Sequence, residues 1–329
     1  MPRVFLFIGM EVVGISISLA LANEEQGVQR IGYDADSSRV RAARKLGAFD
    51  QLVSNPIKTA REAELVFLNV PAGEALGHLE TLAPILREDA VLFDFSSLKQ
   101  GPQQKAMEWF PEGRYYVGAV PVLNPETLNL EDFPVLAPCA DLLANGLLAL
   151  TLPENTPKAV MDLAQSLAAA LQANPYFIDP AEVDGVITSI EQLPLLLSLT
   201  LMNVCIDAPG WREIQRMAGR LWLQMVLPIM KQSPELLAVE LAENKDNVIA
   251  RIQTAMLELE RLRDQIAAGE LQNIQESLED AQGAYEKFFH ARQKADWGRG
   301  ALDRPPLPKQ GFLSRMLGFG GIGRRKLED

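Results

Sequence analysis

A short turn near the start of the chain has residues that could hold a phosphate. Gly9-Met10-Glu11-Val12-Val13-Gly14 follows the apolar run Val4–Ile8 and opens a segment of small and apolar residues. Dinucleotide-binding folds have G-x-G-x-x-G here: the first glycine makes the turn, the second admits the pyrophosphate and the third lets the helix approach the strand. Gly9 and Gly14 keep the outer roles, but Glu11 replaces the middle glycine. The pattern predicts a Rossmann-type turn, which either binds a dinucleotide or is purely structural.

Asp34 is the next candidate. It ends the second apolar run, Val28–Tyr33, twenty residues after Gly14. A carboxylate at this place accepts hydrogen bonds from the adenosine ribose and disfavours a 2′-phosphate, so the predicted cofactor is NAD rather than NADP. An ordinary loop aspartate or a helix cap is the alternative, with Ser37 as a competing cap.

Two later strand ends add polar groups. Val70 and Pro71 close the run that begins at Leu65, and Asp94-Phe95-Ser96-Ser97-Leu98-Lys99 closes the run that begins at Val91. Rossmann ligands lie at the carboxyl ends of strands. Val70 and Pro71 are therefore candidate cofactor contacts, and Ser97 and Lys99, a hydroxyl and an ammonium, are candidate catalytic residues.

The elements that position these residues alternate between strands and helices over the first half of the chain. This alternation predicts an α/β fold with a doubly wound parallel sheet, over residues 1–155. Residues 156–298 have helical spacing and are predicted to form an all-α domain, with the boundary between the two domains expected near residues 155–185. Within it, residues 182–203 are apolar nearly all round, which predicts a helix in a core or dimer interface. Glu191 and Gln192 and the limited length argue against a membrane span, and residues 299–329 read as a flexible tail.

Composition limits the possible partners. The chain has 329 residues, a formal net charge of −12, two histidines and two cysteines. Such an acidic chain repels phosphate backbones, so nucleic acid is not an expected partner. Two widely spaced histidines and two widely spaced cysteines predict no metal site and no disulfide framework, and free thiols suit a cytoplasmic location. His78 and His290 are expected to be surface or packing residues.

Taken in order, these motifs resemble those of the prephenate and arogenate dehydrogenases of tyrosine biosynthesis, over nearly the whole chain. The family's GYD, V-P and D-x-x-S-x-K motifs are matched by Gly32-Tyr33-Asp34, by Val70-Pro71, and by Asp94, Ser97 and Lys99. Further along, the family's G-x-H-P-M is replaced by Gly118-Ala119-Val120-Pro121-Val122, its S-H-L-P-H is replaced by Glu191-Gln192-Leu193-Pro194-Leu195, and its later Arg and Asn correspond to Arg216 and Asn244.

The resemblance implies a function, and comparison with the family motifs shows where this chain lacks a residue that the function needs. Family enzymes transfer a hydride from the carbon bearing the ring hydroxyl to the nicotinamide, while a histidine holds the hydroxyl proton and decarboxylation follows. Val120 replaces that histidine, and an isopropyl group cannot supply general-base catalysis, which contributes roughly 10²–10⁴-fold. The resemblance also implies a homodimer and a small carboxylate substrate, with Gln192 and Arg216 as substrate-binding residues. A helix-surface ion pair is the alternative for Arg216.

Two functions of different classes follow. The first is an NAD-dependent oxidoreductase of the prephenate dehydrogenase type. The second is a non-catalytic descendant that serves as a dimeric scaffold or as a sensor of a small anion, which Glu11 and Val120 favour. The tail after Gly298 is locally basic and carries apolar side chains, so it could touch an anionic membrane, although a disordered terminus is the preferred interpretation.

Overall fold

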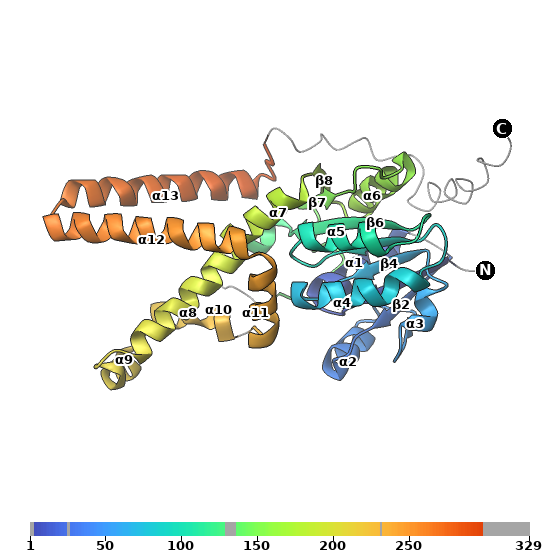
Figure 1. The fold of residues 1–329 in the computed structure, drawn as a ribbon, viewed down its shortest axis with the longest axis horizontal. Coiled ribbons are helices and arrows are strands. Elements are labelled where there is room, and N and C mark those ends of the chain that lie inside the picture. Colours follow the sequence, from blue (N-terminus) through green and yellow to red (C-terminus); the bar gives the residue numbers. More distant parts are fainter. Residues whose placement is uncertain (1–2, 25–26, 129–135, 231, 299–329) are drawn as a thin grey trace. The chain divides into compact units, whose positions relative to one another are not determined.

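A computed structural model describes residues 3–24, 27–128, 136–230 and 232–298. The chain divides into two compact units: unit 1 comprises Met1–Pro180 with Ala284–Asp329, and unit 2 comprises Ala181–Gly283 (Figure 1). The tail predicted for residues 299–329 lies outside the described residues.

Unit 1 is built on one mainly parallel sheet (Figure 1). Its described strands are in the order β3-β2-β1-β4-β5-β6-β7-β8, with only the β6–β7 pair antiparallel. The α/β doubly wound fold is thus confirmed. The strands are β1 (Arg3–Ile8), β2 (Val28–Tyr33), β3 (Gln51–Leu52), β4 (Leu65–Leu68), β5 (Val91–Asp94), β6 (Tyr115–Val122), β7 (Leu147–Thr151) and β8 (Asn174–Phe177).

Helices cover both faces of this sheet. One face packs against α1 and α6, and the other packs against α4 and α5 (Figure 1). Central strands such as β4 are therefore buried on both sides and are apolar throughout, as parallel strands are. The helices of unit 1 are α1 (Val12–Glu24), α2 (Ser37–Lys45), α3 (Ile57–Ala60), α4 (Ala72–Leu82), α5 (Gln100–Trp109) and α6 (Lys158–Ala170), with short 3₁₀ turns η1 (Ala83–Ile85) and η2 (Pro125–Leu128).

Aromatic side chains in register join the central strands. Phe7, Phe67 and Phe93 are neighbours across β1, β4 and β5. The Phe7 and Phe67 rings stack with their centroids 4.5 Å apart, and those of Phe67 and Phe93 stack at 5.7 Å. These large buried rings fix the alignment of the three strands whose carboxyl ends carry the candidate site.

The structure places the boundary between the units at Pro180, within the range of residues 155–185 in which the sequence pattern changes. Unit 1 continues to Pro180 rather than stopping at residue 155, because β7 and β8 extend its sheet past the antiparallel β6–β7 pair. The strand β8 has the sequence Asn174-Pro175-Tyr176-Phe177, and proline and asparagine are poor strand signals. Proline is tolerated here because β8 is the edge strand of the described sheet.

Unit 2 is helical in the residues described, which confirms the all-α second domain. Helices α12 and α13 are joined by Gly269, whose φ of +69° ends α12 in a left-handed cap (Figure 1). The elements are α7 (Pro180–Ile187), a π-helical turn η3 (Thr188–Gln192), α8 (Leu193–Ile206), α9 (Trp211–Met217), α10 (Arg220–Met230), α11 (Pro234–Glu243), α12 (Lys245–Ala268) and α13 (Leu271–Gln293). The last part of α13, from Ala284, belongs to unit 1.

One stretch of unit 2 is apolar and mostly unburied. By length and composition alone, Pro180–Ile206 could cross a membrane, and it is the one described helix for which this holds.

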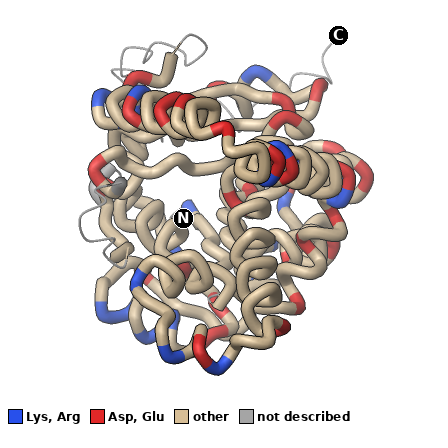
Figure 2. Tube along the Cα trace, turned by 90° about the vertical axis from the view of Figure 1, so that its left-hand side faces the viewer, with Lys and Arg blue, Asp and Glu red and all other residues tan. Residues whose placement is uncertain are grey.

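Acidic and basic residues are interspersed along the chain trace (Figure 2). Cys139 and Cys205 are both free and partly buried.

Candidate functional site

The strand register brings the predicted residues to one edge of the sheet. Ile8, the last residue of β1, pairs with Tyr33 of β2 and with Leu68 of β4. In turn, Leu68 pairs with Asp94 of β5, and Asp94 pairs with Gly118 of β6. The residues that follow these partners therefore lie level with one another, at the carboxyl edge where ligands of open α/β sheets bind.

Gly9 and Gly14 form a turn that only glycine allows. Gly9 has a φ of +91°, and a Cβ there would lie 1.8 Å from the backbone oxygen of Asn69. A Cβ on Gly14 would lie 2.5 Å from the backbone oxygen of Gly9. The turn and the close helix packing expected of the two glycines are thus present. Helix α1 begins at Val12, directly after Gly9-Met10-Glu11, and its first N–H groups have no acceptors within the helix.

Asp34 ties this turn to the end of β2. Its side chain is nearly buried, with Oδ2 accepting from the Met10 backbone N–H at 2.7 Å and Oδ1 from the Asp36 N–H at 2.7 Å. Each oxygen retains a lone pair for a further donor. The cap of α2 is Asp36 rather than Asp34 or Ser37, because Asp36 Oδ1 accepts from the backbone N–H of Ser38 at 2.7 Å.

Glu11, in the place of the middle glycine, forms an ion pair that was not predicted from the sequence. Its Oε1 lies 2.8 Å from a guanidinium nitrogen of Arg39, on the first turns of α2. Arg39 is also 3.7 Å from Asp34 Oδ2 and 3.9 Å from Asp36 Oδ2. The basic residues of α2 were the only sign in the sequence that Glu11 could have a cationic partner. Glu11 and Arg39 are 28 positions apart, and no helix or strand spacing predicts a contact over that separation.

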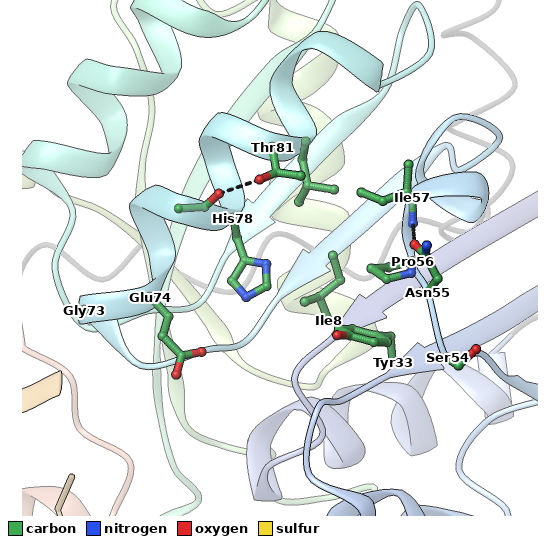
Figure 3. A pocket seen from close by; sticks show the side chains of 12 residues that line it. Ile8, Tyr33, Ser54, Asn55, Pro56, Ile57, Gly73, Glu74, His78 and Thr81 are labelled. Carbon is green, nitrogen blue, oxygen red and sulfur yellow. Dashed lines mark hydrogen bonds between the residues drawn. The ribbon is translucent and has the colours of Figure 1, made fainter. Parts of the chain in front are cut away.

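A cavity of about 640 Å³ lies beside this turn. His78 and Glu74 of α4 line one side, and Ile8, Tyr33 and Pro56 line the other (Figure 3). The His78 ring points into the cavity (Figure 3). Its lining is completed by Ser54, Asn55, Ile57, Gly73, Gly77, Thr81 and Leu82.

His78 therefore lines a cavity rather than serving only as a packing or surface residue. Burial lowers the pKa of His78, and the neighbouring Glu74 opposes that shift only in part. The imidazole is neutral at pH 7 as a result, and a neutral imidazole can donate one hydrogen bond and accept another. Glu74 and His78 are one helical turn apart in α4, so both lie on the same face of this helix.

Lys99, a candidate catalytic residue by its position after a strand end, is fully buried. Its Nζ donates to the backbone oxygen of Ser96 and lies 3.6 Å from Asp94 Oδ2. The Tyr116 hydroxyl donates to the same Asp94 oxygen at 2.8 Å. A Cβ on Gly118 would lie 2.7 Å from Lys99 Cδ, so glycine makes room for the lysine stem. Asp94, Lys99 and Tyr116 form a buried polar cluster.

Ser97 and Val120 lie beside this cluster and are half-buried. Val120 in β6 pairs with Ala149, two residues beyond the Asp94–Gly118 pair that ends β5. Strand residues two apart point to the same face, so Val120 shares a face with Gly118. Val70 and Pro71 are also half-buried, directly before α4.

In unit 2, Gln192 is fully buried at the end of the π-helical turn. Its Nε2 donates to Glu240 Oε1 at 3.0 Å, and its Oε1 accepts from Asn244 Nδ2 at 2.8 Å. The amide of Asn244 also donates to Thr188 Oγ1 at 2.8 Å. Gln192 thus connects the π-helical turn to the junction of α11 and α12.

Arg216 lies elsewhere in unit 2, on α9 and largely exposed. Its guanidinium is 4.0 Å from Glu213, one turn earlier, which is the helix-surface ion pair that the sequence left as an alternative. Within unit 2, no hydrogen bond or ion pair described joins Arg216 to Gln192.

Comparison with known families identifies two domains. Residues 17–176 match the family model described as the prephenate dehydrogenase nucleotide-binding domain, and residues 179–280 match that of the prephenate dehydrogenase dimerization domain. The chain belongs to the prephenate dehydrogenase family. The first match ends near the boundary at Pro180, and it begins downstream of the Gly9–Gly14 turn. The second contains the whole apolar stretch Pro180–Ile206, including the π-helical turn.

Individual relatives are distant but cover most of the chain. The prephenate dehydrogenase of Bacillus subtilis is 24% identical over 275 residues, which are 83% of this chain and 73% of the relative. The crystal structure of Aquifex aeolicus prephenate dehydrogenase, in complex with hydroxyphenyl propionate and NAD+, covers 88% of this chain and 99% of its own, with a TM-score of 0.74 and 20% identity. Synechocystis arogenate dehydrogenase covers 87% and 100%, with a TM-score of 0.66 and 20% identity.

Proposed function

We propose that the chain is an NAD-dependent dehydrogenase of the prephenate type, which oxidises a small carboxylate-bearing hydroxy substrate in tyrosine biosynthesis. The observation that carries this proposal is the turn at Gly9, where no Cβ fits against Asn69, placed beside Asp34 and an open cavity. Membership of the prephenate dehydrogenase family supports it, as does the NAD+ in the similar Aquifex structure. Biosynthetic relatives of this kind favour a cytoplasmic location.

The residues of unit 1 fit an NAD molecule. The first-turn N–H groups of α1 favour the pyrophosphate. Asp34 has lone pairs left for the ribose hydroxyls, and the cavity between Tyr33 and α4 is large enough for adenine. Val70 and Pro71, which precede α4, flank the same edge. The neutral His78 can donate to or accept from the base.

The chain's other residues would bind the substrate and position the reacting groups. NAD+ bound here would supply the hydride acceptor for the carbon that bears the substrate hydroxyl. Ser97, half-buried at the sheet edge, can orient that hydroxyl, but Val120 cannot accept its proton. The exposed guanidinium of Arg216 can bind a carboxylate in a bidentate manner. Lys99 and Gln192, which are buried, act by holding their surroundings in place.

A titration with NAD+ tests the cofactor site. We expect wild-type protein to bind NAD+ by calorimetry, and Gly77→Leu to weaken binding at least about tenfold, which corresponds to 1.4 kcal/mol. Gly77 lines the cavity and a Cβ there meets no atom within 4 Å, so the larger side chain enters the cavity without straining the helix. The matched control is Gly101→Leu in α5, where a Cβ is equally free. Absence of NAD+ binding by the wild-type chain would overturn the proposed function.

A non-catalytic scaffold or small-anion sensor is the second candidate. Val120 favours it, because the described site has an aliphatic side chain where the family's proton acceptor belongs. This candidate predicts NAD+ or anion binding without NADH formation when prephenate or arogenate is added. NADH formation at an ordinary enzymatic rate of 1–10³ s⁻¹ would exclude it.

We also propose that the chain is a homodimer through unit 2, which matches a dimerization domain. Helix α10 leaves large apolar side chains exposed, including Leu221 at 77%. Exposed apolar surface of this kind marks a protein interface. We expect Leu221→Glu to shift the chain from dimer to monomer in sedimentation experiments, whereas Met107→Glu, at an exposed apolar position in unit 1, leaves the dimer intact. A wild-type monomer would contradict this prediction.

A further inference from the structure

Glu11, two residues after Gly9, forms an ion pair with Arg39, and an inference from this pair rests on the proposed function. We propose that the pair sets the cofactor preference of unit 1. It withholds Arg39 from the 2′-phosphate of NADP+, and it turns the Glu11 carboxylate away from the pyrophosphate of NAD+. Glu11 is then a specificity-determining residue rather than a simple loss of the middle glycine.

Arg39 is placed to bind a phosphate beside the ribose. An arginine near the end of β2 is the residue that accommodates a 2′-phosphate in NADP-dependent Rossmann folds. Arg39 is in this position, 3.7 Å from Asp34, the carboxylate expected to meet the ribose. A planar guanidinium also matches a phosphate in bidentate geometry.

Its charge is already compensated by carboxylates. Glu11 lies 2.8 Å away, in hydrogen-bond distance, while Asp34 and Asp36 lie at 3.7 and 3.9 Å. One guanidinium thus faces three carboxylates, and the group carries a net negative charge. A 2′-phosphate arriving here would meet repulsion from this group, and its one cation is occupied by Glu11.

Glu11 depends on Arg39 in return. It directly precedes α1, whose N-terminus attracts anions. A free carboxylate at this place would compete with the pyrophosphate for the same N–H groups. Because Arg39 holds it on the side of α2, the turn keeps its capacity for NAD+. The two side chains are partly exposed, so their ion pair adds little to the free energy of unfolding. We therefore expect the pair to affect ligand binding rather than stability.

A double-mutant cycle tests the pair, with Kd values for NAD+ and NADP+ measured by calorimetry. Glu11→Gln frees Arg39, and we expect NADP+ to gain at least about tenfold in affinity relative to NAD+, as charge-assisted hydrogen bonds provide. Arg39→Gln leaves Glu11 unpaired, and NAD+ binding is expected to weaken severalfold. The double variant should recover NAD+ binding without the gain for NADP+. Both differences should shrink at high salt.

Arg41→Gln is the matched control, because Arg41 is on the same helix but bonds to Ser37 Oγ at 3.2 Å. It should leave the NAD+ to NADP+ ratio unchanged. An equal gain for both cofactors in Glu11→Gln would overturn the inference, since it would mean that Glu11 merely repels phosphates. NAD+ binding by wild type with a constant ratio in all variants overturns the inference alone. Binding of neither cofactor by wild type overturns the proposed function and this inference with it.

Discussion

Replacing Val120 with histidine is expected to raise the rate of NAD+ reduction with prephenate by about 10²–10⁴-fold, the usual contribution of a general base. Val120 is half-buried in β6, two residues after Gly118, which pairs with the last residue of β5. This position is at the carboxyl edge of the sheet, as is the Gly9 turn. A histidine at this position could accept the hydroxyl proton, which an isopropyl group cannot. NADH formation followed by absorbance measures the change.

The pH profile identifies the cause of such a gain. A general base must be deprotonated, so kcat/KM of the Val120→His variant should rise with pH through the ordinary histidine pKa near 6.5. Val122→His is the matched control, because Val122 is on the same strand and the same face, two residues further along. It should give no gain. If Val120→His binds NAD+ but stays inactive at every pH, the pocket serves another purpose and the sensor or scaffold function is favoured.

Lys99→Met is expected to lower the free energy of unfolding by about 3–5 kcal/mol, the cost of breaking a buried ion pair. The methionine keeps most of the stem volume but removes one cation from Asp94, which is fully buried and, among the residues that the structure describes, keeps the Tyr116 hydroxyl and the Ser96 backbone N–H as donors. Urea-induced unfolding measures the loss. This result would assign Lys99 a structural role.

Two further variants control for the loss of positive charge and for the cause of the destabilisation. Lys105→Met removes an exposed lysine that pairs with Glu108 at 2.7 Å, and should cost no more than about 1 kcal/mol. Adding Asp94→Asn to Lys99→Met removes the stranded charge and should recover part of the loss. An unchanged unfolding midpoint in Lys99→Met, with activity lost, would instead support the catalytic role predicted from its position after a strand end.

Much of unit 1 could be predicted from local sequence. The runs Val4–Ile8 and Val28–Tyr33 are apolar for the length of a buried strand, and Gly9 and Gly14 stand where a tight turn needs them. The carboxyl ends of parallel strands meet at one edge by geometry alone, so the order of Asp34 and the later motifs predicted a shared site. The strand register confirms this edge.

What the sequence missed depends on partners distant along the chain. From the sequence, Glu11 places a carboxylate in the expected phosphate site. The structure shows that this carboxylate pairs with Arg39, 28 residues later. The sequence suggested that Lys99 is accessible, but in the structure its side chain is buried against Asp94 and Gly118. Residue spacing shows which side chains share a helix or a strand, but it does not show how far a flexible side chain reaches.

The α/β fold, the helical second unit and the family follow from the sequence alone, because strand length, turn glycines and motif order can be recognised from neighbouring residues in the chain. The end of the main segment of unit 1 at Pro180, the place of His78 beside a cavity and the pairing of charges became known from the folded structure. Burial and electrostatic pairing depend on distances between side chains, and packing sets those distances after the strands and helices have formed.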